Sequence, residues 1–171
     1  MQEVFTTGEV SLRSFELSDI EHFMTWAGDD NVTQHLAWDT YTSKDNGKKF
    51  LESMAIPHPW FKAICFNGVP IGSLTLTQGS GLDCCRAELG YVLQKAHWGK
   101  GLITQAVKLA LMQGFKELEI QRVEAFVHPE NKASQKVLLK AGFVQEGLLR
   151  KYKFIKGTVR DCLVFSYLKS F

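Results

Sequence analysis

The spacing of apolar residues divides the N-terminal third of the chain into one strand and two helices. Val10–Phe15 alternates apolar and polar residues, as a half-buried antiparallel strand does. Ile20–Ala27 follows the helical period, and Gly28 is typical of a helix end. Ser43 is a good N-cap for a further short helix, whereas residues 29–41 show no clear period. We expect this unpatterned stretch to form a loop or a broken helix over apolar residues.

The middle of the chain is typical of an antiparallel meander. Trp60–Phe66 and Val69–Leu76 both have strand character. Asn67 and Gly68 lie between them and favour a type I′ turn, which needs positive φ at both central residues. A third strand, Arg86–Leu93, follows a glycine-rich turn.

The stretch after that third strand has the pattern of an anion-binding site. Gly99 and Gly101 separate the strand from an amphipathic run that extends to Phe115, and we expect both glycines in the first turn of this helix. The first N–H groups of a helix lack intrahelical partners, and the helix dipole is positive at that end. Such a junction favours a phosphate or a pyrophosphate.

The C-terminal third continues with a strand, a helix and a strand pair. Arg122–Val127 is the strand, and Asn131 caps the helix, which Gly142 closes in a Schellman-like ending. The last two strands are expected at about Leu148–Ile155 and Val159–Leu168.

This order of elements predicts an α+β, or mixed α/β, fold with a central, largely antiparallel sheet and helices on both faces. Residues 1–171 are expected to form a single domain, since no repeat, low-complexity segment or linker interrupts them. The composition, 45% hydrophobic and 22% charged, is ordinary for a globular protein that buries a core.

Charge and cysteine usage narrow the function classes. The net charge of +2 gives no argument for a nucleic acid or an anionic membrane as partner. No apolar run approaches the roughly 18 residues that span a bilayer, and no signal-peptide pattern is visible. The four cysteines show no C-x-x-C spacing, so we expect reduced thiols and a cytoplasmic protein. The five histidines lie far apart, so no metal site is expected.

Two better-known glycine motifs do not fit the loop before the long helix. A P-loop needs Lys-Ser or Lys-Thr after its last glycine, which is absent after Gly101. A dinucleotide fingerprint needs a third glycine where this chain has Thr104. Taken alone, Gly99 and Gly101 are also compatible with an ordinary tight turn.

Longer motifs around this loop resemble those of a known superfamily. Glu88–Leu93 followed by Trp98–Ala106 resembles motif A of the GNAT superfamily of N-acetyltransferases. His128–Phe143 resembles motif B, especially in its Asn…Ser…Gly-Phe spacing. The closest resemblance is to the branch that contains the ribosomal-protein alanine and serine N-terminal acetyltransferases and their plant relatives. It covers nearly the whole chain.

The resemblance implies an acyl-CoA N-acyltransferase fold that binds acetyl-CoA. A bulge would splay the Arg86–Leu93 strand from its parallel neighbour and free backbone groups for the co-substrate. Along the acetyl-pantetheine arm would lie Tyr91, Val92 and Leu93, with an N–H near Leu93 as oxyanion donor. Asn131 would both cap its helix and hydrogen-bond the pantetheine. The pyrophosphate would bind backbone N–H groups of Gly99, Lys100, Gly101, Leu102, Ile103 and Thr104, where side chains on the glycines would block a close approach.

Two positions depart from the family pattern. Motif A starts with Gln or Arg three residues before its first glycine, whereas this chain has Ala96, a change that backbone contacts tolerate. Many members use a Tyr seven residues after the Asn as general acid to the thiolate, and here that residue is Leu138. In the ribosomal-protein branch a Ser is the proposed substitute, so Ser134 is expected to donate a hydrogen bond to the sulfur. A structural role for Ser134 in the first helical turn is equally compatible.

The nucleophile must be a neutral amine, so a general base is expected. A free α-amino group has a pKa of about 7.7–8.0, against about 10.4 for the lysine side chain. An α-amine therefore loses its proton more readily at neutral pH than a lysine does. Glu88 is the candidate base because it lies in an otherwise apolar strand, where burial would raise its pKa. A structural ion pair with a cation, such as Arg86 or Arg122, is the alternative interpretation. Asp161 and His97 are further candidate bases.

Together these features favour an acetyl-CoA-dependent N-acetyltransferase that moves acetyl directly to a primary amine in a ternary complex. No cysteine falls in the motifs, so no acetyl-cysteine intermediate is expected. The resemblance favours a protein or peptide N-terminus as acceptor, with a polyamine or other small amine as the alternative. A non-catalytic CoA-binding regulatory module and a phosphate- or nucleotide-binding module of another fold are also compatible with the sequence, as are a monomer and a homodimer.

Overall fold

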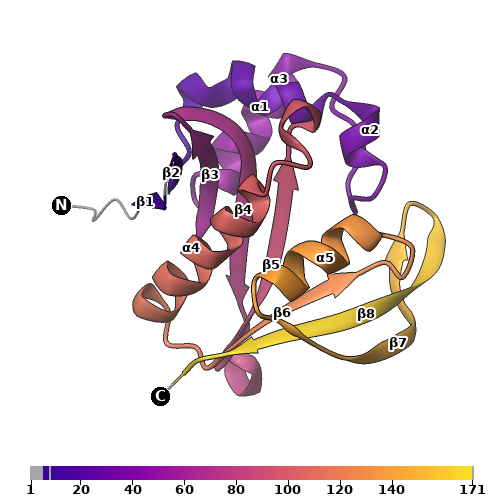
Figure 1. The fold of residues 1–171 in the computed structure, drawn as a ribbon. Helices are drawn as coiled ribbons and strands as arrows, with labels where there is room; N and C mark the ends of the chain where they lie inside the picture. Colours follow the sequence, from indigo (N-terminus) through magenta and orange to yellow (C-terminus); the bar gives the residue numbers. More distant parts are fainter. Residues whose placement is uncertain (1–5, 8, 171) are drawn as a thin grey trace.

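The computed structural model describes residues 6–7 and 9–170. Within those residues eight strands form one sheet in the order β1-β2-β3-β4-β5-β6-β8-β7 (Figure 1). The strands are β1 (Thr6–Thr7), β2 (Val10–Ser14), β3 (Phe61–Phe66), β4 (Val69–Gln78), β5 (Arg86–Leu93), β6 (Arg122–Val127), β7 (Val144–Ile155) and β8 (Thr158–Leu168). The helices are α1 (Ile20–Ala27), α2 (Asp30–Thr33), α3 (Lys44–Phe50), α4 (Leu102–Glu117) and α5 (Lys132–Lys140). Neighbouring strands are antiparallel except β5 and β6, which confirms the largely antiparallel sheet.

Each face of the sheet has its own helices and its own core. On the face covered by α4 and α5, Leu76, Leu89 and Ala106 belong to the larger core. On the face covered by α1 and the π-helical turn that follows α3, Trp26 and Leu51 belong to the smaller core. We call these the α4–α5 face and the α1–α3 face. Because successive side chains of a strand point to opposite faces, β5 contributes to both.

Local signals end several elements where the sequence predicts. Asn67 and Gly68 have φ of 50° and 79°, as a type I′ turn requires. After α5 the Phe143 N–H donates to the Leu138 carbonyl oxygen at 3.0 Å, and Gly142 has φ of 97°. This is the predicted Schellman ending. The unpatterned stretch contains the short helix α2 followed by turns, so it is a broken helix.

β5 and β6 pair only at their N-terminal ends. The parallel ladder joins Arg86 to Arg122, then the next residue pair, then Glu88 to Glu124. Beyond it the two strands diverge, as Figure 1 shows from their common base, and we call this divergence the fork. β5 keeps a continuous register with β4 throughout, so the fork forms without the bulge that the resemblance implied. β6 instead follows β8, with which it pairs along its whole length.

A charge network holds the closed end of the fork. Glu124 is 5% exposed and accepts hydrogen bonds from the guanidinium groups of Arg86 and Arg122. Arg122 also donates two hydrogen bonds of 2.8 Å to Glu146 on β7, whose carboxylate accepts a further one from the Ser166 hydroxyl. These bonds, chiefly those from Arg122, lower the pKa of Glu146 to about 2. β5, β6, β7 and β8 are thus tied together where β5 and β6 still pair.

The hairpin of β7 and β8 reaches across to α2. Lys156 and Gly157 form its turn, with φ of 48° and 76°. The Lys156 ammonium group donates to the carbonyl oxygen of Thr33, the last residue of α2, at 2.7 Å. The end of the hairpin and α2 lie on the same side of the molecule in Figure 1. Among the described residues no helix combines the length and apolar character needed to cross a bilayer.

Candidate functional site

A cavity of about 820 Å³ runs through the fork. It is lined by both faces of β5, by the end of β6, and by the N-terminal turns of α4 and α5. On the α4–α5 face it meets the loop before α4 and the start of α5, a region that we call the cradle end. On the α1–α3 face it ends among Trp38, Phe61 and Phe126, which we call the aromatic end. Its volume is in the range of small-molecule sites.

The loop before α4 depends on two glycines in the left-handed region. Gly99 has φ of 74° and Gly101 has φ of 76°. The sequence predicts both glycines in the first turn of the helix, and this is wrong. α4 begins at Leu102, so the glycines belong to the loop before it. A Cβ on either glycine would meet no atom within 4 Å. The positive φ alone therefore favours glycine at both positions, and no protein atom crowds them. The expectation that side chains here would block the approach of a pyrophosphate stays a prediction.

The first turn of α4 presents backbone donors to the cavity. The first intrahelical bond runs from the Gln105 N–H to the Gly101 carbonyl oxygen at 3.2 Å. The N–H groups of Leu102, Ile103 and Thr104 precede it, and all three residues line the cavity together with both glycines of the loop. The dipole of this 16-residue helix adds a positive potential at the same place. The predicted anion cradle therefore has its donors on the cavity wall.

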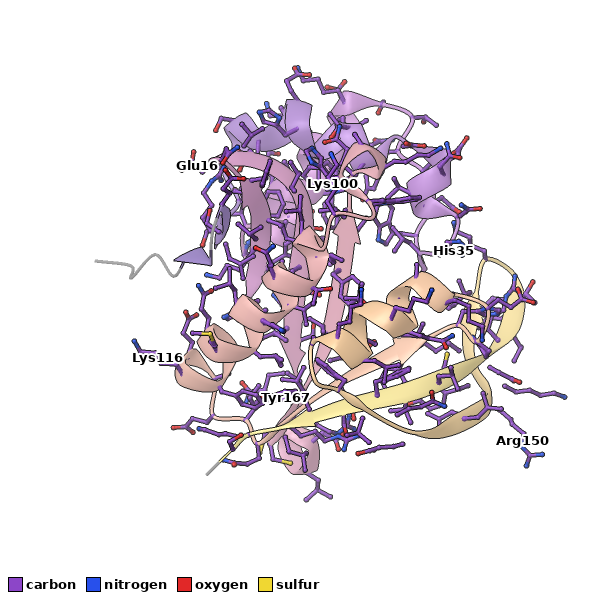
Figure 2. The ribbon with its side chains drawn as sticks, in the orientation of Figure 1. Glu16, His35, Lys100, Lys116, Arg150 and Tyr167 are labelled. Carbon is purple, nitrogen blue, oxygen red and sulfur yellow. The ribbon has the colours of Figure 1, made fainter. Side chains whose placement is uncertain are left out.

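The loop's larger side chains brace it from outside. The Lys100 ammonium group donates to the Ala96 carbonyl oxygen at 3.0 Å, which turns it back along the chain and away from the cavity. Lys100 is labelled in Figure 2, on the loop that joins β5 to α4. Trp98 Nε1 donates to the Leu93 carbonyl oxygen at 2.8 Å and fastens the loop to the end of β5. Of the six loop and helix residues predicted to bind pyrophosphate, Lys100 can thus contribute only backbone.

β5 has backbone N–H groups that face the cavity. The Gln94 N–H donates to the Ile71 carbonyl oxygen at 2.8 Å, which makes Leu93 and Gly72 a non-hydrogen-bonded pair of the β4–β5 ladder. The N–H of Leu93 therefore points away from β4, and by alternation so does that of Tyr91. Because β6 leaves the ladder at the fork, both N–H groups lie beside the opening and not beside a partner strand of the described sheet.

Asn131, Ser134 and Tyr91 meet at the cradle end. The Asn131 side-chain oxygen accepts from the Ser134 N–H at 3.1 Å, which confirms the predicted helix cap. The Ser134 hydroxyl lies 2.5 Å from the Tyr91 hydroxyl, and the phenol also donates to the Ser134 carbonyl oxygen at 3.3 Å. All three residues line the cavity. Burial raises the pKa of Tyr91 to about 12, so the phenol stays protonated at neutral pH.

The position at which the family pattern expects a tyrosine faces the core. Leu138 is fully buried in the core of the α4–α5 face. The phenol beside the start of α5 comes instead from Tyr91 on β5, 43 residues before Ser134. The sequence predicted Tyr91 only as a residue along the pantetheine arm, so the position of its hydroxyl group is new.

Glu88 lies in the cavity wall but is not buried. Its side chain is 46% exposed and accepts a hydrogen bond of 2.7 Å from the Lys153 ammonium group. The expected burial is absent because this part of the α1–α3 face is open to the cavity and is not covered by a helix. Both alternative partners, Arg86 and Arg122, pair with Glu124 instead.

Aromatic rings form two walls of the aromatic end. On one side the Lys153 ammonium group lies 4.5 Å from the centre of the Phe126 ring. On the other side Trp38 and Phe61 are the ends of a chain of ring contacts, with centroid separations of 5.6 to 6.0 Å. Tyr41 and Phe50 are the two rings between them, and burial raises the pKa of Tyr41.

The other two candidate bases are less suitably placed. His97 packs near the glycine loop, 5.9 Å from the Phe66 ring, and its pKa is lowered by burial and by the charge of Lys100. Its Nδ1 atom is buried without a partner among the described residues. Asp161 lines the cavity, but its carboxylate accepts the Lys151 N–H at 2.7 Å and supports the β7–β8 hairpin. In the described ranges no group of three His, Cys, Asp or Glu side chains could hold a metal.

Sequence reasoning missed Lys153 and Phe126 as residues of the site. Lys153 lies 65 residues from its partner Glu88, and its neighbours in the sequence are the aromatic residues Tyr152 and Phe154. Its place follows from its pairing with Arg160 across the hairpin, which comes directly after an irregular stretch of the ladder. Figure 2 shows Arg150, on the same strand, pointing away from the molecule. No local pattern distinguishes the inward lysine from the outward arginine.

The sequence profile of the acetyltransferase (GNAT) domain matches residues 9–144 of the chain. The chain is 32% identical to the uncharacterized N-acetyltransferase p20 of Bacillus licheniformis over 176 positions, covering 98% of this chain and 97% of that protein. It is 36% identical to the spermidine N(1)-acetyltransferase of Escherichia coli K12 over 78 residues, covering 46% of this chain and 42% of that protein.

Solved structures share the fold. The microcin C7 self-immunity acetyltransferase, in complex with acetyl-CoA and AMP, has a TM-score of 0.84 at 22% identity, covering 95% of this chain and 94% of that one. The ribosomal L7/L12 α-N-protein acetyltransferase, in complex with coenzyme A, has a TM-score of 0.84 at 20% identity, covering 97% of this chain and 98% of that one. The spermidine N-acetyltransferase of Vibrio cholerae, in complex with CoA and spermine, has a TM-score of 0.79 at 21% identity, covering 95% of this chain and 96% of that one. The predicted mixed α/β fold is confirmed.

Proposed function

The chain belongs to the acetyltransferase (GNAT) family and is an acetyl-CoA-dependent N-acetyltransferase, and we propose that its acceptor is the α-amine of a protein or peptide N-terminus. The observation that carries this proposal is the cavity through the fork. It joins an anion cradle on one face of the sheet to a charged, aromatic site on the other. Direct transfer between two bound substrates requires such a passage.

The cradle end fits the pyrophosphate and pantetheine groups of acetyl-CoA. Backbone donors and a helix dipole suit a pyrophosphate, and the N–H groups of β5 suit the amides of a pantetheine arm. We assign the pyrophosphate to Gly99, Lys100, Gly101, Leu102, Ile103 and Thr104. We assign the pantetheine arm to Tyr91, Val92, Leu93 and Asn131. Lys136 and Lys140 of α5 also line the cavity and would add positive charge beside the phosphates.

Bound acetyl-CoA supplies an activated acetyl thioester, and the remaining work is assigned to residues of this chain. The acceptor nitrogen attacks the thioester carbon, so a C–N bond forms, the C–S bond breaks, and CoA leaves as a thiolate. The Leu93 N–H donates to the carbonyl oxygen while negative charge develops there. Glu88 accepts the proton that the attacking nitrogen loses. Lys153 holds this carboxylate in place through its ion pair.

Ser134 is proposed to stabilise the leaving sulfur, with Tyr91 as a positioning residue. A phenol of pKa about 12 is too weak an acid to protonate a thiolate, whose thiol has a pKa of about 8.5. Tyr91 has one hydroxyl hydrogen. When it donates this hydrogen to Ser134 Oγ and not to the Ser134 carbonyl oxygen, the Ser134 hydroxyl can donate its own hydrogen to the sulfur. The thiolate then takes its proton from water.

A polyamine is the second candidate acceptor, because the E. coli relative named for spermidine shares 36% identity with under half of this chain. The charges of the aromatic end argue against it. Glu88 is paired with Lys153, and Asp161 lies beside Arg160 on β8, so two carboxylates are balanced by two cations. A polycation needs a surplus of negative charge, whereas a single α-amine does not.

A CoA-binding module without turnover is the other alternative, and the burial of Leu138 in place of the expected tyrosine favours it. Tyr91 and Ser134 supply hydroxyl groups at the cradle end, where the family pattern expects the hydroxyl group of a tyrosine from α5. Turnover therefore does not require a tyrosine from α5.

The test combines binding and turnover. Calorimetry should show acetyl-CoA binding with Kd in the micromolar range, about −8 kcal/mol. Thiol release should then depend on an added amine, with peptide N-termini ahead of spermidine. Binding without thiol release for any amine would support the regulatory module, and no binding would remove the proposal altogether.

Glu88→Gln tests the assignment of the base. The variant should lose about a hundredfold in kcat, within the usual range for a general base. Its affinity for acetyl-CoA should stay unchanged, because Glu88 lies on the opposite face of β5 from the cradle. If the pH–rate profile of the variant matched that of the parent, Glu88 would not be the base.

A further inference from the structure

The aromatic end has features that select the side chain next to the acceptor amine. Resting on the proposed function, we propose that the acceptor is an α-amine whose own side chain is large and apolar, as at an N-terminal phenylalanine or leucine.

The floor of the aromatic end is a row of residues across three strands that becomes smaller from β3 to β5. Phe61, Thr75 and Gly90 are register partners on β3, β4 and β5, so they lie side by side on the α1–α3 face. Glu88 precedes Gly90 by two residues on the same strand and points to the same face. Because Gly90 has no side chain, the surface between the carboxylate and the Phe61 ring is hollow, with the Thr75 hydroxyl group at its base. Phe61 is two strands, or about 10 Å, from Gly90.

The space above this floor is closed by apolar groups. Phe61 and Trp38 line it on one side, Phe126 lines it on the other, and Val92 bounds it along β5. Trp38 and Phe61 are partly exposed, and their ring contacts with Tyr41 and Phe50 hold them in place. An apolar side chain placed here is removed from water against aromatic surfaces, whereas a small polar side chain would bury less apolar area and an ammonium group would lose its hydration. The Ser73 and Thr75 hydroxyl groups are polar groups that line the same cavity.

The charges define where the amine and its neighbouring carbonyl lie. Glu88 is the carboxylate nearest to the hollow floor and would receive the amine. Lys153, paired with Glu88 at 2.7 Å, is the adjacent cation and would face the carbonyl group that follows an α-amine. Amine, carbonyl and side chain diverge from one carbon, which matches a carboxylate, a cation and an apolar hollow around one point.

The first experiment compares three amino acid amides of the same charge and adds spermidine as a polycationic acceptor. Phenylalaninamide, leucinamide, serinamide and spermidine are tested with saturating acetyl-CoA, and thiol release gives kcat/KM for each. We expect phenylalaninamide and leucinamide to exceed serinamide by about tenfold or more, the usual discrimination of an apolar pocket. Free phenylalanine and a phenylalanine-initiated peptide then distinguish a small-molecule acceptor from a peptide N-terminus.

The second experiment removes the wall. Phe61→Ala should reduce kcat/KM for phenylalaninamide by about tenfold and change kcat/KM for serinamide by less than about twofold. The preference of the enzyme for phenylalaninamide over serinamide would then become smaller. Calorimetric titration of phenylalaninamide into the enzyme–CoA complex should show the same loss in binding. The matched control is Phe115→Ala on α4, which also removes a partly buried ring, one that packs against Tyr167 away from the cavity.

The outcomes separate this inference from the proposed function. Transfer to several amines without a preference for apolar side chains would overturn the inference and leave the acetyltransferase assignment intact. A Phe61→Ala variant that lost activity equally toward every acceptor would overturn it as well. Failure to acetylate any amine, with acetyl-CoA bound, would instead overturn the proposed N-terminal acceptor.

Discussion

The two ends of the cavity are built from different kinds of atoms. At the cradle end the groups on the wall are mostly main-chain N–H groups, held by the φ angles of Gly99 and Gly101 and by the start of α4. At the aromatic end they are side chains from β3, β5, β6 and β7 and from the stretch after α2. The first end depends on backbone conformation and the second on which residues occupy distant positions.

This difference predicts how each end of the cavity responds to amino acid substitution. A backbone cradle tolerates side-chain changes, as the turned-away ammonium group of Lys100 illustrates. A pocket of side chains changes its preference with each substitution. We therefore expect mutations in the glycine loop of the cradle end to alter affinity for acetyl-CoA, and mutations at the aromatic end to alter the choice and protonation of the acceptor.

The largest expected effect is that of Gly101→Val at the cradle end. A β-branched residue does not adopt φ of 76° without strain of at least about 1–2 kcal/mol, so the loop must shift and misdirect its N–H groups. Affinity for acetyl-CoA should fall by about a hundredfold, as measured by calorimetry. The control is Gly157→Val in the hairpin turn, where φ is also 76° and no atom is close. A similar loss of affinity in the control would attribute both effects to general destabilisation.

Next in size are variants of the two hydroxyl groups at the cradle end, which are assigned to the leaving sulfur and not to the pyrophosphate. Ser134→Ala should lower kcat by about tenfold or more, and Tyr91→Phe by somewhat less, while acetyl-CoA affinity stays unchanged. Because the two hydroxyl groups are 2.5 Å apart and act in series, the double variant should be no slower than Ser134→Ala alone. Additive losses in kcat would show that Tyr91 does not act through Ser134.

A smaller effect is expected from Lys153→Gln at the aromatic end. A cation beside the bound amine disfavours the ammonium form, so its removal should raise the pKa of the amine in the complex. The rate should fall by about threefold to fivefold at neutral pH and recover above about pH 9, as followed in a pH–rate profile. Arg150→Gln is the control, since Arg150 points away from the cavity on the same strand (Figure 2). An unshifted profile in the Lys153 variant would remove Lys153 from the site.

The smallest effect concerns the closed end of the fork, where neither substrate is expected. The pKa of Glu146 is about 2 in the folded protein, below its unfolded value of about 4.3. The folded state therefore binds fewer protons in this interval, and the contribution of Glu146 to stability is present above about pH 4.3 and is lost as pH falls toward 2. Thermal melts of Glu146→Gln should thus differ from the parent by a few degrees at pH 7 and converge near pH 2. A constant difference at all pH values would contradict the low pKa.

The cradle end was largely predictable from the sequence because its determinants are local. Asn131 and Gly142 carry the signals of their own helix ends, and the bounds of β5 follow from a largely apolar segment between a glycine-rich turn and the loop before α4. The error there concerned Gly99 and Gly101, which precede α4 and do not begin it. A glycine pair before an amphipathic run fits both interpretations, and only the positive φ decides between them.

The aromatic end was not predictable because its contacts are set by register and by the fork. The sequence placed Glu88 correctly on its strand but could not show that β6 diverges there and leaves the carboxylate exposed. Its partner Lys153 depends on an irregular hairpin register. The contact between Tyr91 and Ser134 depends on how α5 sits over the fork. These are tertiary arrangements for which no local period exists.

The hydrogen bond from Lys156 to Thr33 has a consequence for how the aromatic end can open. The two residues are 123 apart in the sequence, and one such bond contributes about 1 kcal/mol, far less than the entropy of closing so long a loop. The sheet must therefore already hold the hairpin near α2 before the bond can form. By the same reasoning, the bond can break without disturbing the sheet. The hydrogen bond therefore acts as a reversible latch between the hairpin turn and α2, and its release leaves the sheet folded.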